Sequence, residues 1–246
     1  MVLENKVVLI TGARRLGSAV AGAVAQRGAD VSLSFRRSRN DLSRAEKLVK
    51  QAERDILVTK VDLSSPDECR YLIHQTVEKF GRLDVLINMA SSYEQNSVDN
   101  LTELDWDKAI SVDARAAYIC ALAAIPHLRN AGGGHIINFS DWTAASGRPR
   151  YLGYLPYYVA KSAVIGLTES LALELAVDGI LVNAIAPGPI EAPPGTSDEE
   201  IKAVEQTTPL GRWGGENVIA STVVSLLESE FVTVETIRVE GGRHIR

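Results

Sequence analysis

Hydrophobic positions along the chain form short runs of consecutive Val, Ile and Leu, which alternate with longer stretches of helical periodicity. The runs predict strands at residues 7–10, 30–35, 56–61, 84–89, 135–140, 181–186 and 236–239. The helical stretches cover residues 16–27, 41–53, 66–80, 104–128, 157–177 and 217–227. Consecutive apolar residues are typical of strands that are covered on both faces. The pattern predicts an α/β fold: a single doubly wound Rossmann-type parallel sheet with helices on both faces, formed by residues 1–246 as one domain.

Capping residues support several of these boundaries. Gly28 and Gly81 stand just past two predicted helix ends, and Pro66 lies in a predicted first turn. Thr102 with Asp105, and Ser197 with Glu200, have the spacing of a capping box. Helix ends are therefore predicted independently of the hydrophobic pattern.

Composition excludes several classes of protein. The 246 residues carry 26 Lys and Arg against 31 Asp and Glu, a net charge of −5 without a basic stripe, which argues against a nucleic-acid partner. The longest uninterrupted apolar run, residues 116–125, is too short to cross a bilayer. No basic-then-apolar leader precedes the first strand, so we expect a cytoplasmic protein. Two isolated Cys and four scattered His indicate neither disulfides nor a metal site.

Ligands of such sheets bind beyond the carboxyl ends of the strands, near the point where the strand order reverses. The first of these positions carries TGARRLG over residues 11–17, directly before a helix. Glycines there let backbone amides and the helix N-terminus approach a diphosphate. The alternative is a tight turn that only packs the helix against the sheet. The residues expected to bind a dinucleotide are Gly12, Arg14, Arg15, Leu16 and Gly17.

The end of the second predicted strand is basic. Folds of this kind that prefer NAD place an acidic residue here to bind the ribose hydroxyls. This chain instead has Phe35, Arg36, Arg37 and Ser38. Because a guanidinium matches a phosphate with a planar fork of donors, these residues predict NADP(H) as the cofactor. The alternative is a solvated basic loop.

Tyr157 and Lys161 stand four residues apart at the start of a long predicted helix. They therefore share one helical face and can approach each other. A nearby ammonium stabilises a phenolate and makes the phenol a usable proton donor. Taken alone, the pair also fits an ordinary surface of an amphipathic helix.

Together these motifs resemble the short-chain dehydrogenase/reductase family over nearly the whole chain. Further matches are Asp62-Leu63, Asn88-Met89-Ala90, VNAIAPGPI at residues 182–190 and the C-terminal VEGGRH. Within the family, the residues around Arg15, Phe35 and Asp141 are most similar to the pteridine-reductase-type branch.

The resemblance implies roles for individual residues. Tyr157 would protonate the substrate, and Lys161 would bind the nicotinamide ribose and lower the pKa of Tyr157. The resemblance also implies that the reaction needs no metal ion. The remaining implied cofactor contacts are Asp62 and Leu63 at the adenine, Asn88, Met89 and Ala90 along the ribose, Ser140 beside the catalytic pair, and Pro187, Gly188 and Ile190 at the nicotinamide.

The chain departs from the family pattern around the catalytic residues. The glycine turn is one residue shorter than usual, and Ala144 occupies the position of the family's catalytic Ser. Asp141, or next Ser140, is expected to take that place. Asp113 replaces the helix Asn that takes part in a proton relay. An aspartate beside the tyrosine would act as a proton source or would bind the amino-pyrimidine edge of a pterin, with Tyr93 and Trp142 as flat walls or as core residues.

Two further segments carry expectations. Residues 191–208 begin with Pro and Gly and continue as a short helix, which predicts a substrate lid unless it is a surface excursion without a role. The Ala-rich predicted helices at 104–128 and 157–177 offer flat faces, and the family resemblance implies a homo-oligomer, a dimer or tetramer.

The leading hypothesis is an NADPH-dependent reductase of a C=O or C=N bond, with a pteridine-like heterocycle as the first substrate. One alternative is a carbonyl or 3-oxoacyl reductase of the same family. A third possibility is a catalytically weak protein that binds NADP(H) as a sensor. The Tyr157 and Lys161 pair favours an enzyme, because a sensor has no use for a tuned phenol.

Overall fold

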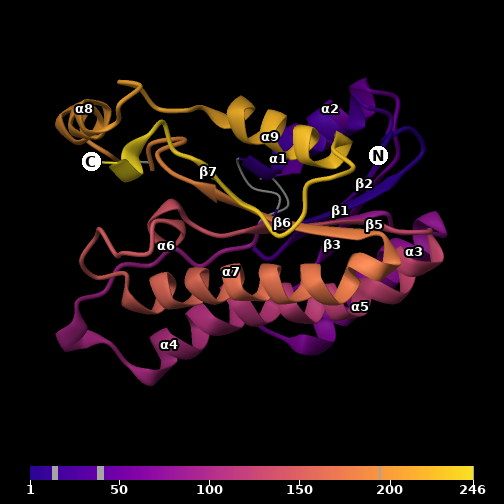
Figure 1. The fold of residues 1–246 in the computed structure, drawn as a ribbon, viewed down its shortest axis with the longest axis horizontal. Coiled ribbons are helices and arrows are strands. Elements are labelled where there is room, and N and C mark those ends of the chain that lie inside the picture. The colour runs from indigo at the N-terminus through magenta and orange to yellow at the C-terminus, as the bar shows by residue number, and fades with distance from the viewer. Residues whose placement is uncertain (13–15, 38–41, 194, 246) are drawn as a thin grey trace.

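The computed structural model describes residues 1–12, 16–37, 42–193 and 195–245. Seven strands form one parallel sheet in the order β3-β2-β1-β4-β5-β6-β7, which confirms the predicted fold class (Figure 1). The order reverses between β1 and β4, the crevice where such sheets bind ligands. The strands are β1 Val7–Thr11, β2 Asp30–Phe35, β3 Ile56–Lys60, β4 Val85–Asn88, β5 Gly134–Phe139, β6 Ile180–Pro187 and β7 Thr236–Val239.

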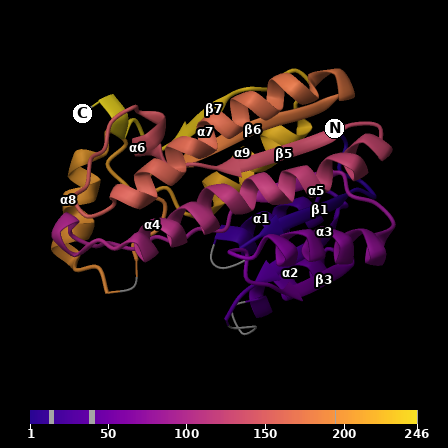
Figure 2. The same cartoon turned by 90° about the horizontal axis from the view of Figure 1, so that it is seen from below.

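Helices cover both faces of the sheet. On one face lie α1 (Leu16–Ala25), α2 (Ser43–Gln51) and α9 (Glu216–Glu228). On the other, seen from below in Figure 2, lie α3 (Pro66–Phe80), α5 (Ala116–Asn130) and α7 (Leu155–Leu175). The chain is thus a three-layer arrangement with the sheet in the middle.

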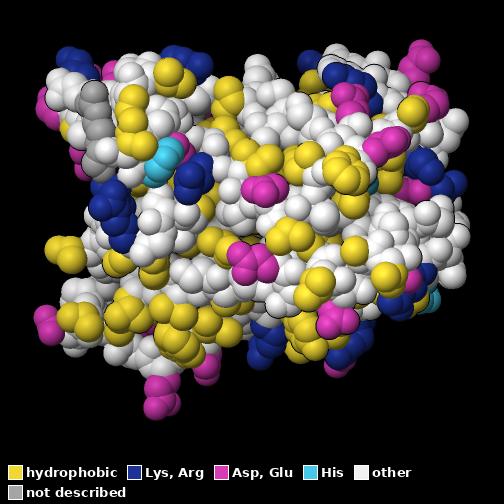
Figure 3. Space-filling view, in the orientation of Figure 1, with side chains coloured by type: hydrophobic (Ala, Val, Ile, Leu, Met, Phe, Trp, Pro, Cys, Tyr) yellow, Lys and Arg dark blue, Asp and Glu magenta, His cyan; other side chains and the backbone are white. Residues whose placement is uncertain are grey.

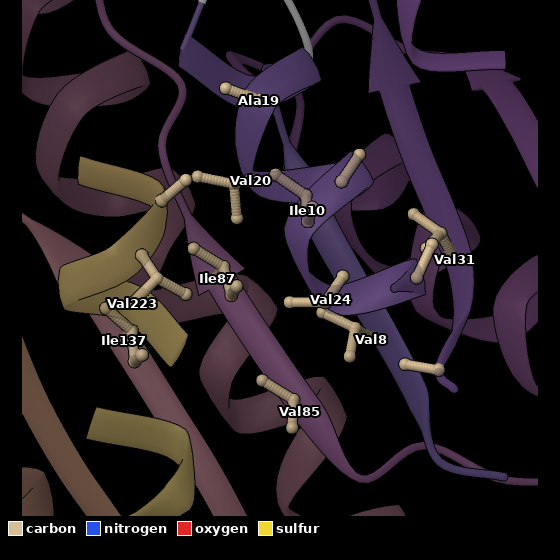
Figure 4. Packing of buried hydrophobic residues seen from close by; sticks show 14 of the residues in the cluster. Val8, Ile10, Ala19, Val20, Val24, Val31, Val85, Ile87, Ile137 and Val223 are labelled. Atoms are coloured by element: carbon tan, nitrogen blue, oxygen red, sulfur yellow. The ribbon is translucent and has the colours of Figure 1, made fainter. Parts of the chain in front are cut away.

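Alternation along β1 builds the core on both sides. Val8 and Ile10 are fully buried in the cluster under α1 and α9, to which Val20 and Val223 also belong (Figure 4). Val7 and Leu9 point the other way, into the cluster under α3, α5 and α7. This double burial explains why the strand is apolar at consecutive positions.

The predicted helix at 104–128 proves to be three consecutive segments. α4 (Glu103–Ala109) starts with the expected capping box of Thr102 and Asp105. It continues through a π-helical segment, η3 (Ile110–Arg115), into α5. A π-bulge inside an α-helix is often found at functional sites, and this one contains Asp113.

The run Glu103–Asn130 is long and apolar enough, by length and composition, to cross a membrane. This differs from the expectation based on the shorter run at 116–125, because the three segments form one continuous helix of 28 residues. Half of its most apolar window is buried within the protein. Its packing against α3 and α7 is that of a core helix.

Two local features were not predicted. A short helix, α6 (Trp142–Ala145), follows β5, and the Asp141 side chain caps it by accepting from the Thr143 amide. The two free cysteines, Cys69 of α3 and Cys120 of α5, are buried in one cluster, where the Cys69 thiol donates 3.4 Å to the Leu63 carbonyl. The predicted helix after β6 is present as α8 (Asp198–Thr207), with the capping box of Ser197 and Glu200.

Candidate active site

A cleft of about 1260 Å³ opens at the carboxyl ends of β1, β4, β5 and β6. Its walls bring together residues from distant parts of the sequence, from the glycine turn to the C-terminal segment. The sequence-predicted residues that line it are Gly12, Leu16, Met89, Ala90, Ser140, Asp141, Tyr157, Lys161, Pro187, Gly188 and Ile190.

Tyr157 and Lys161 lie on the same face of α7, as their spacing predicted. The ammonium of Lys161 stands 5.7 Å from the centroid of the Tyr157 ring. Its Nζ donates a hydrogen bond of 2.9 Å to the carbonyl of Phe139, the last residue of β5. Lys161 is only 2% exposed, so the strand end holds its charge in one place.

Asp113 of the π segment forms an ion pair with Lys161, with 3.1 Å between Oδ1 and Nζ. The hydroxyls of Ser91 and Ser92 and the Ser92 amide donate to the same carboxylate at 2.5, 2.6 and 3.0 Å. Four donors therefore satisfy a carboxylate that has no exposed side-chain surface. The π-helical segment with its extra residue therefore holds this acid against Lys161.

The two candidates for the family's Ser position make different contacts. The Tyr157 hydroxyl donates to Asp141 Oδ2 at 3.1 Å. The hydroxyl of Ser140, in contrast, donates 2.8 Å to the backbone carbonyl of Lys161. Asp141 thus contacts the phenol, whereas Ser140 fixes the helix that carries it.

The electrostatics of this pair differ from the expectation of a lowered tyrosine pKa. Burial raises the pKa of the Tyr157 phenol well above its usual range, and the negative charges of Asp141 and Asp113 raise it further. The phenol therefore stays protonated at neutral pH.

Aromatic rings form the wall beyond Tyr157. Tyr93 stacks on Tyr154 with 4.6 Å between centroids and meets Tyr157 edge-on at 4.9 Å. Tyr151 lies edge-on to both Tyr154 and Trp142. The sequence left open whether Tyr93 and Trp142 form a wall of the site or belong to the core. Both line the cleft, although Trp142 is only 4% exposed. The aromatic residues at 151 and 154 were missed, since a loop carries no periodic signal.

The glycine turn is held at the end of β1. Gly12 has a φ of +75°, and a Cβ there would come within 2.9 Å of the Ala90 backbone. Thr11, which sequence analysis did not single out as a separate residue, accepts from the amides of Met89 and Ala90 at 3.0 and 3.2 Å. This hydroxyl ties the β1 end to the β4 end across the crevice. Gly17 is buried at the start of α1, while Arg14 and Arg15 lie outside the described residues.

Asn88 makes its contacts inside the protein. Its amide donates 2.9 Å to Asn138 of β5, and the residue is 6% exposed. The side chain therefore joins β4 to β5, while the following two residues line the cleft.

The ends of β2 and β3 lie together at the far edge of the crevice. Arg36 and Arg37 are exposed, and Ser38 lies outside the described residues. Asp62 accepts from the amide and hydroxyl of Ser64, which lowers its pKa, and the charges of Arg36 and Arg37 lower it further. The arginines after β2 therefore lie close enough to Asp62 for their charges to act on its carboxylate. Phe35 ends β2, and Leu63 is buried with an exposure of 8%.

The segment after β6 closes the other side of the cleft. A Cβ on Gly188 would come within 2.4 Å of the Glu240 side chain, so only glycine fits there. α8 has no buried residue, and the Trp213 indole donates to the Ile201 carbonyl at 3.4 Å. Ala203 and Val204 of this helix face the cleft.

The residues present fit a dinucleotide. A glycine at the β1 end with no room for a Cβ, a buried ammonium and an elongated cleft across the strand crossover are the features such a ligand needs. Within the described ranges, no group of His, Cys, Asp and Glu could hold a metal ion.

Residues 12–244 match the family model described as enoyl-(acyl carrier protein) reductase. The chain is 34% identical over 246 residues to 3-oxoacyl-(acyl carrier protein) reductase FabG of Staphylococcus aureus, covering 98% of this chain and 99% of that protein. A short-chain dehydrogenase/reductase from Serratia marcescens has a TM-score of 0.91, with 27% identity over 99% of this chain and 100% of that one. Carveol dehydrogenase from Mycobacterium avium, solved with NAD, has a TM-score of 0.89 and 25% identity, covering 100% of this chain and 99% of that one.

Proposed function

The chain belongs to the short-chain dehydrogenase/reductase family, and on that premise we propose that it is an NADPH-dependent carbonyl reductase. The observation that carries the proposal is the buried Tyr157–Lys161 pair in the cleft at the strand crossover, with Asp141 on the phenol. The reductase named in the Staphylococcus aureus relative supports a 3-oxoacyl-type substrate.

Tyr157 is the proposed proton donor. A phenol that stays protonated at neutral pH suits reduction, where the substrate oxygen needs a proton. It suits oxidation poorly, because that direction needs a phenolate. We therefore propose that the arrangement of Tyr157, Asp141 and Lys161 serves the reduction of a carbonyl at neutral pH.

The proton leaves Tyr157 Oη for the substrate oxygen. That oxygen must first take the hydroxyl's hydrogen bond from Asp141, since the phenol has only one donor. The phenolate that remains is stabilised by the Lys161 ammonium, which Asp113 and the Phe139 carbonyl keep in position. Asp113 is thus proposed as a positioning residue and Ser140 as a support of α7.

NADPH would supply the hydride when bound. We propose that Gly12, Leu16 and Gly17 hold its diphosphate and that Met89 and Ala90 lie along its ribose. Pro187, Gly188 and Ile190 would lie at the nicotinamide, with Lys161 on its ribose. Arg36 and Arg37 would bind the additional phosphate, since no acid stands at the end of β2.

A pteridine-like heterocycle is the second candidate substrate. Asp141 offers a carboxylate to an amino-pyrimidine edge, and the stacked rings of Tyr93 and Tyr154 offer a flat wall. The same carboxylate is less suited to a plain ketone, whose developing oxyanion it would repel.

Substrate assays and one substitution test the proposal. Purified protein is mixed with NADPH and either acetoacetyl thioester or biopterin, and the loss of NADPH absorbance is followed. Tyr157→Phe should lower kcat by about a hundredfold to ten-thousandfold, the usual contribution of a general acid, while NADPH fluorescence titration shows unchanged binding. A weak NADP(H)-sensing protein would show no turnover in either form. Turnover that survives in Tyr157→Phe would remove the phenol from the mechanism.

We further propose that residues 191–208 act as a lid and that the chain forms a homo-oligomer. Exposed Tyr118 and Leu122 on α5, and Leu173 on α7, give these helices apolar outer faces. Light scattering of the purified protein measures the oligomeric state.

A further inference from the structure

Two guanidinium groups stand at the end of the cleft away from the glycine turn. The Cζ atoms of Arg150 and Arg243 lie 5.5 and 5.4 Å from the ring centroid of Trp142, and both residues line the cleft. Figure 3 shows dark-blue side chains beside the C-terminal end marked in Figure 1. The carboxylate of Asp141, next in the chain to Trp142, faces Tyr157 instead. The two guanidinium groups therefore lie near the indole, while the neighbouring carboxylate is bonded to Tyr157.

The C-terminal segment is built to hold Arg243 in place. The Glu240 carboxylate, 6% exposed, accepts from the Gly242 amide at 3.1 Å and from the His244 amide at 2.7 Å. Its Oε1 also contacts Nδ1 of His244 at 2.8 Å. Arg148 and Arg150 both donate to the His244 carbonyl. Arg243 thus projects from a turn that is fixed on both sides.

The charge of Arg243 is not neutralised by the described residues. Among them, no carboxylate lies within ion-pair distance, and the buried Nη1 has no hydrogen-bond partner. Three acids of the described residues line the cleft and act elsewhere: Glu200 caps α8, Asp141 contacts Tyr157 and Thr143, and the charge of Glu191 acts on Arg44. A buried donor without a partner costs free energy that a bound acceptor would recover.

The positive charge of the two arginines acts on the pKa of the neighbouring Tyr151. Burial raises the pKa of Tyr151, while the charges of Arg243 and Arg150 oppose that rise and Asp141 adds to it. Both guanidinium groups therefore act on the aromatic wall of the cleft itself, not only on the outer surface.

We propose that Arg243, with Arg150, binds an anionic group of the substrate, a carboxylate or a phosphate, remote from the carbonyl that is reduced. A guanidinium presents the planar fork of donors that such groups match. The aromatic wall of Tyr151 and Tyr154 would contact the apolar part between the two ends. This inference rests on the proposed function and names the substrate class of the same site.

Matched pairs of oxo acids and their methyl esters, of increasing chain length, test the proposal in the NADPH assay. The ratio of kcat/KM for acid over ester should fall by about tenfold or more in Arg243→Gln, because the lost bond is charge-assisted. The effect should appear in KM for the acid, and Arg243→Lys should recover part of it. Arg129→Gln is the control: it removes an equal charge from an exposed residue of α5 that pairs with Asp178 and does not line the cleft. There the ratio should stay within about twofold, since an exposed charge is screened by salt.

A binding measurement without turnover separates this proposal from the proposed function. Trp106→Phe with Trp213→Phe leaves Trp142 as the only indole, and its fluorescence is titrated with glutarate and with neutral glutaramide. Glutarate alone should change the signal, and Arg243→Gln should abolish that change. Equal binding of glutarate in Arg243→Gln, or of glutaramide in the parent, overturns the proposal. If neither acids nor esters oxidise NADPH while glutarate binding depends on Arg243, the proposed reaction fails and the anion site stands.

Discussion

Two buried aspartates lie at opposite ends of the same sheet, and their surroundings differ. Asp84 precedes β4 at the amino end: Arg82 donates to it at 2.6 and 2.7 Å, and the Val7 amide at 3.0 Å. Asp113 lies at the carboxyl end against Lys161. The two residues are 1% and 3% exposed. Burial and ion pairing are thus common to both.

The two aspartates differ in how exposed the cation paired with each of them is. The Arg82 side chain is 41% exposed, so the charge beside Asp84 reaches water and the acid joins β1 to β4. The Lys161 side chain is 3% exposed and lies under the Tyr157 ring, which lines the cleft. A buried ion pair therefore indicates a site only where its neighbours face a cavity at the carboxyl ends of the strands.

Removing each acid tests this comparison most strongly. Asp113→Ala leaves Lys161 sealed without a counter-ion, so it should lower the free energy of unfolding by about 3–5 kcal/mol. Asp84→Ala should cost less, because Arg82 can be hydrated. Folded Asp84→Ala should keep its kcat, whereas Asp113→Ala should lose it.

Urea unfolding and NADPH oxidation below the unfolding range measure both effects. Asp113→Asn is the control, since an amide oxygen still accepts from Lys161 and should recover much of the stability. If Asp84→Ala is inactive while fully folded, the division between a structural end and a reacting end is wrong.

His135 extends the comparison at the amino end of the sheet. Its amide donates 3.1 Å to the Asp84 carbonyl, and burial lowers its pKa to about 4, with the N-terminal ammonium adding to the shift. The unfolded chain takes up a proton near pH 6.5, whereas the folded chain resists it. Stability is therefore complete above about pH 6.5 and is lost as the pH falls toward 4, by about 3 kcal/mol in total.

Urea unfolding at a series of pH values measures this loss, and His135→Gln should flatten the curve between those limits. Circular dichroism at each pH gives the folded fraction. The pH dependence of kcat in the folded protein should be the same in both forms, because His135 is far from the cleft lining. A shift of the pH dependence of kcat in His135→Gln would instead show that the amino and carboxyl ends of the sheet are coupled.

The sequence predicted some features of the sheet and of the cleft at its carboxyl end, and the physical reasons differ from residue to residue. Consecutive apolar residues predicted every strand end to within one position, and the spacing of Tyr157 and Lys161 predicted that the two share a helix face, which lies at the cleft. The ion pair of Asp113 could not be predicted, because it depends on a π turn that the 3.6-residue pattern does not reveal. Cys69 and Cys120 are buried in one cluster between two helices that no local rule pairs.

The smallest expected effect concerns the far edge of the crevice, where Arg36 and Arg37 follow β2. A contact between a guanidinium and the additional phosphate of NADPH is consistent with a preference over NADH of about tenfold, or about 1.4 kcal/mol. Arg36→Gln combined with Arg37→Gln should remove that preference by weakening NADPH alone. Fluorescence titration of both cofactors measures it, and Arg70→Gln, an exposed arginine paired with Asp67 on α3, is the control. A preference of the unaltered protein for NADH would show that the two arginines face solvent, and the acid at this edge, Asp62, would then be the residue to test against the ribose.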